Sequence, residues 1–181
     1  MLQDAIYLRD YARALSLAGV RSADEGTLLM FDEHSAGAIT VERSLHDDFL
    51  KDLGVTQEEA EATEASPTTL AYTSFLLRTA VLGDYPEVLG AVLPCYWIYR
   101  EVGKTLLEDG SPEPRYRKWI DTYSGDEFDK LVEAVLDLTD RGCEDLNASQ
   151  RARVRKAFVI SSRYEWMFWD AAWRLEGWHV E

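Results

Sequence analysis

A cysteine and a tyrosine lie four residues apart in one hydrophobic stretch of the chain. Cys95 and Tyr99 belong to the run Leu93-Pro94-Cys95-Tyr96-Trp97-Ile98-Tyr99. If this run is helical, side chains four positions apart share a face, so the thiol and the phenol project together. A thiol in such a place can act as a nucleophile. A lone cysteine is more often a small core residue, however, so this pattern alone leaves both interpretations open.

A carboxylate lies among aromatic residues near the end of the chain. Glu165 follows Tyr164 and precedes Trp166-Met167-Phe168-Trp169. The carboxylate is either on an exposed stripe of a helix or buried between these rings. Burial would raise its pKa, because an apolar environment disfavours the charged form, and a raised pKa suits a proton donor.

Other polar side chains could line a site. Asp4 and Tyr7 share a helix face near the start of the chain, whereas Tyr72, Tyr99 and Tyr123 lie farther along. Each tyrosine could equally be a core residue with its hydroxyl at the surface. Glycine-rich phosphate loops and the Gly-x-Ser-x-Gly motif are absent, and the only Glu-x-x-His match is Glu176 with His179 near the chain end. A di-iron bundle needs two such matches, so we expect no metal.

Helical periodicity and cap signals predict the elements that must position these residues. Period-two alternation never persists, so we expect no sheet. Ser66 before Pro67 is typical of a helix start. Capping boxes are indicated at Thr56–Glu59 and at Ser124–Glu127, and Asn147 is predicted to cap the last helix. Together these signals predict one all-α helical bundle, a single domain over residues 1–181, with helices over residues 2–21, 24–53, a short segment after 56, 67–82, 85–109, 115–123, 128–141 and 147–176.

Composition narrows the function classes. A net charge of −14 makes nucleic acids and anionic membranes unfavourable partners, because the summed field repels them. The chain has no apolar run long enough to span a membrane and no secretory leader at its start, so we expect a cytoplasmic protein. In that compartment Cys95 and Cys143 should stay reduced.

Five segments, in order over residues 3–173, are together similar to the TenA family of thiaminase II enzymes, the aminopyrimidine aminohydrolases. With Cys95 present, the chain resembles the cysteine-bearing class of this family. The segments are Gln3–Leu8 with Tyr11-Ala12-Arg13, Pro67-Thr68 with Ala71-Tyr72-Thr73, Leu93–Tyr99 with Glu101 and Gly103, Trp119–Ser124 with Glu127-Phe128, and Tyr164-Glu165-Trp166 with Phe168-Trp169.

The resemblance implies a fold similar to haem oxygenase, a homotetramer and an activity in thiamin salvage. The implied reaction hydrolyses an aminomethylpyrimidine, and thiamine more slowly, to hydroxymethylpyrimidine without a cofactor. By resemblance Cys95 is the nucleophile, Glu165 the acid for the ring nitrogen, and Tyr7 an enhancer of the thiol. Asp4 would bind the aminopyrimidine edge, and the ring would be lined by Tyr72, Tyr99 and Tyr123. For the acid role we expect the Glu165 carboxyl to be buried, with a raised pKa.

One departure from the family pattern concerns the start of the chain. Family members normally carry a further helix before the Gln-Asp segment, whereas Asp4 here lies three residues from the start. We therefore expect a shortened chain with an exposed apolar flank and an Asp4 held by a fraying helix end. A non-catalytic pyrimidine-binding or regulatory protein, and a metal- or haem-binding relative of the same fold, are the alternatives.

Overall fold

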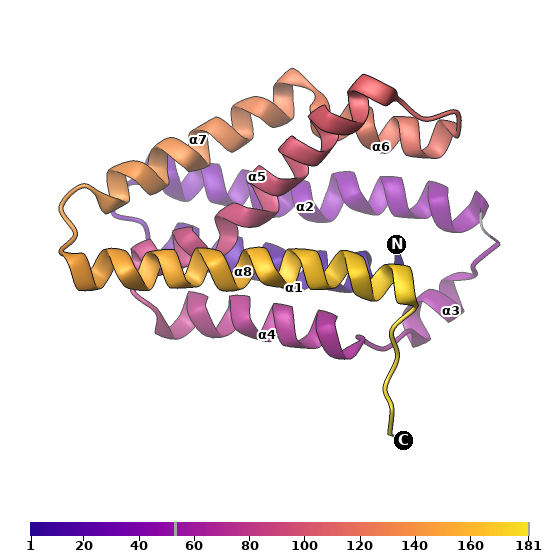
Figure 1. Cartoon of the computed structure of the whole chain (residues 1–181), viewed down its shortest axis with the longest axis horizontal. Helices are drawn as coiled ribbons and strands as arrows, with labels where there is room; N and C mark the ends of the chain where they lie inside the picture. Colours follow the sequence, from indigo (N-terminus) through magenta and orange to yellow (C-terminus); the bar gives the residue numbers. More distant parts are fainter. Residues whose placement is uncertain (53, 181) are drawn as a thin grey trace. The chain divides into compact units, whose positions relative to one another are not determined.

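A computed structural model describes residues 1–52 and 54–180 of the chain. Over these residues it contains helices and no strand, so the predicted all-α class is confirmed (Figure 1). None of the described helices has both the length and the apolar character of a membrane span. The helices are α1 (Leu2–Val20), α2 (Glu25–Asp52), α3 (Gln57–Ala62), α4 (Pro67–Leu82), α5 (Tyr85–Asp109), α6 (Pro114–Ser124), α7 (Asp126–Cys143) and α8 (Ala148–Arg174).

The helix starts follow local capping chemistry. Thr56 and Glu59 form the predicted capping box, and the Ser66 hydroxyl accepts from the N–H of Thr69 at the start of α4. Asn147 and Gln150 exchange side-chain and backbone hydrogen bonds of 3.0 Å at the start of α8, which confirms that cap.

The capping box predicted at Ser124–Glu127 is wrong. Gly125 is the N-cap of α7 and gives no side-chain hydrogen bond. Ser124 cannot take this position because it is still the last residue of α6. Other predicted ends differ by one or two residues from the observed ones, and α8, for example, ends at Arg174, before Glu176. Leu53, the predicted last residue of α2, lies outside the described residues.

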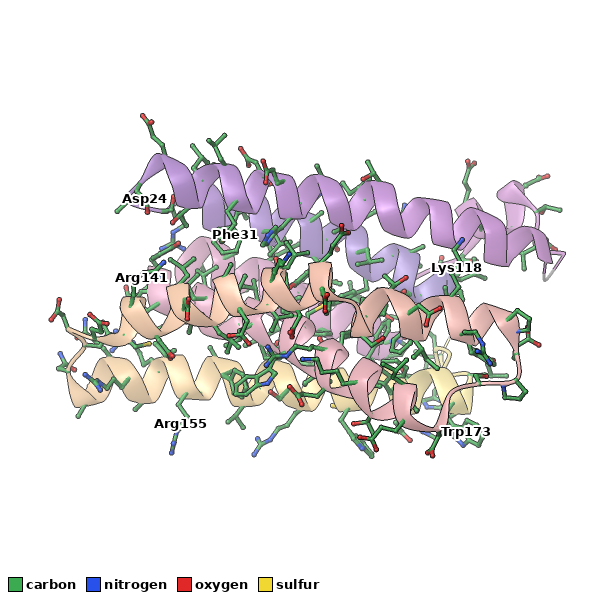
Figure 2. The ribbon with its side chains drawn as sticks, turned by 90° about the horizontal axis from the view of Figure 1, so that it is seen from above. Asp24, Phe31, Lys118, Arg141, Arg155 and Trp173 are labelled. Atoms are coloured by element: carbon green, nitrogen blue, oxygen red, sulfur yellow. The ribbon has the colours of Figure 1, made fainter. Side chains whose placement is uncertain are left out.

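The chain divides into two compact units, of which the first comprises residues 1–85 and 166–181. In this unit α1 packs along both α2 and α4 (Figure 1). Phe31 of α2 is fully buried and lies where a Cβ on Gly19 of α1 would meet it at 3.1 Å (Figure 2). Tyr7, Leu15 and Tyr72 are buried in the same unit.

The second unit, residues 86–165, contains all of α5 except its first residue. Arg100 of α5 forms ion pairs with Asp129 and Glu133 of α7. The first part of α8 lies close to α5 at Gly90, where a Cβ would come within 2.8 Å of the Val154 carbonyl oxygen. Only a residue without a side chain allows this approach. The single domain over residues 1–181 stays a prediction.

Candidate functional site

The candidate nucleophile lies on α5, in the second unit. Cys95 follows Pro94 inside an uninterrupted α5, and Tyr99 lies one turn further along the same helix. Neither cysteine of the chain forms a disulfide, and Cys95 is half-buried. Tyr99 is buried, with 7% of its surface exposed. The predicted pair therefore lies on one helix, and the cysteine is not fully buried, which is compatible with a reactive thiol.

Glu165 is buried, with 1% of its surface exposed, although it lies beside solvent-exposed tryptophans. The expectation of a buried carboxyl is confirmed and the exposed alternative is wrong. One turn before Glu165, the Ser161 hydroxyl donates to the Ala91 carbonyl over 2.6 Å. Ala91 is one turn before Cys95, and both helices run in the same general direction (Figure 1). Cys95 and Glu165 thus each follow, by one turn, the point where α5 and α8 are joined.

An aromatic cluster joins α5 to α6 and α7 in the second unit. The Tyr99 ring lies 5.0 Å from Tyr123 and 5.9 Å from Trp119 between centroids. Tyr123 also contacts Trp119 at 4.7 Å and Phe128 at 5.0 Å. The structure therefore brings Tyr99 and Tyr123 together. That they line a ring-binding wall, as the resemblance implies, stays a prediction. Trp119 and Phe128 were not predicted to belong to the site.

Gly103 allows this cluster to form. A Cβ there would lie 2.7 Å from the Tyr123 carbonyl carbon and 2.9 Å from its oxygen. Both atoms belong to the backbone, so neither can turn aside. We expect Gly103→Ala to lower the free energy of unfolding by about 1–3 kcal/mol, as overpacking does, and to reduce activity by displacing Tyr123.

Urea unfolding measures this effect, and Gly37→Ala is the matched control. A Cβ at Gly37, inside α2, meets nothing within 4 Å. Alanine should therefore raise stability there by about 0.5–1 kcal/mol, because glycine is a poor helix former. Equal effects of the two substitutions would contradict the close approach at Gly103.

The first unit holds the other predicted site residues. Tyr7 of α1 is 2% exposed, and its ring stacks on Tyr72 of α4 at 5.0 Å and on Tyr11 at 5.4 Å. Phe168 completes this group, 5.4 Å from Tyr7. Asp4, half-buried in the first turn of α1, precedes Tyr7 by three residues and so lies on the same side of that helix.

The first turn of α1, which carries Asp4, is tethered by Gln3. That this helix end frays stays a prediction. The side-chain amide of Gln3 donates to the Glu64 carbonyl over 2.8 Å, and its oxygen accepts from the Ser66 N–H over 2.8 Å. A side-chain amide that uses both its donor and its acceptor fixes orientation as well as distance. Sequence reasoning missed this role of Gln3, since its partners are more than sixty residues away.

Glu176, considered above as half of a metal motif, has another partner. Its carboxylate accepts hydrogen bonds from the Thr68 N–H over 2.8 Å and from the Thr68 hydroxyl over 3.0 Å. Among the described residues, no three acidic, histidine or cysteine side chains form a group that could hold a metal ion. Glu176 therefore binds the start of α4, where a negative charge is favourable.

This contact predicts a pH dependence. Burial raises the pKa of Glu176, but hydrogen bonds from Thr68 and Ser66 and the charge of Arg174 lower it overall, below its ordinary value of 4.5. A lowered pKa stabilises the fold above the unfolded value, and this stabilisation is lost as pH falls through the folded value. We expect Glu176→Ala to lower the Tm at neutral pH. The difference from the natural chain should shrink below about pH 4.5.

Thermal melts of both proteins, followed by circular dichroism at matched pH, check this expectation. A Tm difference that stays constant down to about pH 3, well below the ordinary glutamate pKa, would contradict it.

The fold and the site together define an all-α protein that carries a half-buried cysteine and a buried glutamate on two hydrogen-bonded helices. The sequence profile of the TENA/THI-4/PQQC family matches residues 1–175, and the chain belongs to this family.

Individual relatives and a solved structure support this family assignment. The chain is 40% identical to the aminopyrimidine aminohydrolase of Bacillus subtilis, over 98% of this chain and 75% of that protein. It is 37% identical to the aminopyrimidine aminohydrolase of Halalkalibacterium halodurans, over 99% of this chain and 81% of that protein. A TenA homologue from P. horikoshii has a TM-score of 0.84 and 34% identity, over 96% of this chain and 80% of that one.

Proposed function

We propose that the chain is an aminopyrimidine aminohydrolase of thiamin salvage. Its substrate would be 4-amino-5-aminomethyl-2-methylpyrimidine, with thiamine used more slowly. Both would give 4-amino-5-hydroxymethyl-2-methylpyrimidine. The observation that carries this proposal is the buried carboxyl of Glu165, one turn beyond the hydrogen bond that joins α8 to the cysteine-bearing α5. The names of the similar enzymes support it.

In the proposed reaction Cys95 is the nucleophile. Its thiolate adds to the pyrimidine ring, which breaks aromaticity and lets ammonia leave from the exocyclic methylene. Water then adds to the methylene, and the thiolate is expelled as aromaticity returns. The net change exchanges an amine for a hydroxyl at one carbon. The half-buried position of Cys95 supports this role, since a nucleophile must be reached by its substrate.

Glu165 is proposed as the acid that protonates a ring nitrogen during the addition. A proton on nitrogen takes up the charge that the thiolate brings, which lowers the barrier to addition. The burial of the carboxyl supports this role, because a proton donor shielded from bulk water can be held in place against the ring.

The remaining residues are proposed to bind the ring. The Asp4 carboxylate would accept from the exocyclic amine, and Tyr7 would enhance the thiol. Tyr72, Tyr99 and Tyr123 would line a flat heterocycle, which aromatic walls suit. The rings of Tyr72 and Tyr99 already lie in stacked or edge-to-face groups, which supports this use. We further propose a cytoplasmic homotetramer that requires no metal.

Product measurements with two substrates test the proposal. The purified protein receives the aminomethylpyrimidine or thiamine, and hydroxymethylpyrimidine is measured by chromatography. We expect product from both, formed faster from the amine. Product binding without turnover would instead favour a non-catalytic pyrimidine-binding protein. Bound iron or a haem absorption band would favour the metal- or haem-binding alternative.

A further inference from the structure

Three side chains from distant parts of the chain bind the segment Glu64–Thr68, which leads into α4. Gln3 contacts Glu64 and Ser66 through its amide. The Glu176 carboxylate accepts hydrogen bonds from both the N–H and the hydroxyl of Thr68. The indole N–H of Trp178 donates to the Ala65 carbonyl over 3.0 Å. All these residues belong to the first unit. The segment is thus held from the start of the chain and from its end.

The Glu176 contact suits the chemistry of a helix start. The first N–H groups of a helix have no partner within the helix and carry partial positive charge. Ser66 satisfies the N–H of Thr69 over 3.3 Å, and Glu176 satisfies that of Thr68. The carboxylate accepts two charge-assisted hydrogen bonds here, and such bonds are stronger than neutral ones. The residue therefore fixes both the position and the rotation of the first turn of α4.

That turn leads directly to a proposed ring-binding residue. Tyr72 follows Thr68 by four residues on the same face of α4. It is fully buried and stacks on Tyr7 at 5.0 Å, with the two rings inclined by 29°. A small rotation of α4 would move this ring sideways across Tyr7, because the ring lies several ångströms from the helix axis.

We propose that Glu176 is a positioning residue for the proposed reaction: by holding the first turn of α4, it sets the Tyr72 ring against Tyr7 and so sets the affinity for the pyrimidine. The inference rests on the proposed function, because it assigns Tyr72 to the ring site. It differs from a purely stabilising cap, which would change the Tm and leave the KM of the folded enzyme unchanged.

Steady-state kinetics with the aminomethylpyrimidine separate the two roles, at a temperature where every variant is folded by circular dichroism. We expect Glu176→Ala to raise KM about tenfold, because the Tyr72 ring would no longer be held in place against Tyr7. Its kcat should stay within about threefold of the natural value, since no group that reacts is removed.

Three matched variants complete the test. Glu176→Gln should bring KM back to within about threefold, because the amide oxygen still accepts from the Thr68 N–H and its NH2 group can donate to the Thr68 hydroxyl. Thr68→Val removes only the hydroxyl contact, so its KM should lie between the two. Glu33→Ala, at an exposed position of α2, should match the natural chain.

The outcomes are distinguishable. A natural chain that forms no product overturns the proposed function and this inference with it. An active natural chain whose Glu176→Ala variant melts earlier but keeps its KM overturns the inference alone. Failure of Glu176→Gln to restore KM would also overturn it. If Glu176→Ala does not fold, Thr68→Val decides, and an unchanged KM in that variant counts against the proposal.

Discussion

Cys95→Ser should lower turnover at least about a hundredfold, because a hydroxyl is a far poorer nucleophile than a thiol near neutral pH. The fold should survive, since serine is close to cysteine in size and Cys95 is only half-buried. Rates of hydroxymethylpyrimidine formation, measured beside circular dichroism spectra, give both readouts.

Cys143→Ser is the matched control for this prediction. Burial, and then the charge of Asp140, raise the pKa of the Cys143 thiol, while Arg151 opposes them. Cys143 therefore stays protonated near neutral pH and is a poor nucleophile. Its replacement should leave the rate unchanged. If the two serine variants had the same rate, the assignment of Cys95 as the nucleophile would be wrong.

Glu165→Gln should abolish most turnover while product binding is largely kept. Glutamine is nearly isosteric and can still donate a hydrogen bond, but it cannot transfer a proton. We expect a loss of about a hundredfold or more, the range for removal of a positioned general acid. The side chain is 1% exposed, so an isosteric amide also avoids leaving a cavity.

Two measurements read this substitution. Steady-state rates give the loss of turnover, and titration calorimetry with hydroxymethylpyrimidine gives the affinity. Unchanged rates would end the acid hypothesis. Loss of binding together with rate would make Glu165 a recognition or structural residue, because a proton donor for the addition step is not needed to hold the product.

Most helices could be predicted because their signals are local. The Thr56 capping box, the Ser66-Pro67 start and the Asn147 cap each act within four residues. The same reliance on local signals explains why the start of α7 was predicted at the wrong residue. Ser124 has the right type for a cap, but the chain uses it to end α6 and lets Gly125 begin the next helix.

The burial of Glu165 could not be read from local hydrophobicity. Its neighbour Trp166 is 68% exposed, whereas Glu165 itself is buried. Trp173, labelled in Figure 2 near the end of α8, is 88% exposed. When aromatic residues surround a position on all sides of a helix, their pattern does not show which face of the helix turns inward. The residue types that carry the resemblance led to the correct expectation here.

The tethers of α4 were missed because their partners are far apart in sequence. Glu176 reaches Thr68 across 108 positions and Trp178 reaches Ala65 across 113. Neither contact leaves a periodic or capping signal in the sequence around Glu176 or Trp178. Glu176 and His179 instead resembled half of a metal motif, a pattern that two residues often form by chance.

The most direct test of the proposed cysteine mechanism is a single-turnover measurement of hydroxymethylpyrimidine from the aminomethylpyrimidine, with protein in excess and a metal chelator present. We expect full conversion by the natural chain and almost none by Cys95→Ser over the same period. Absence of product from the natural chain, or equal conversion by the serine variant, would contradict it.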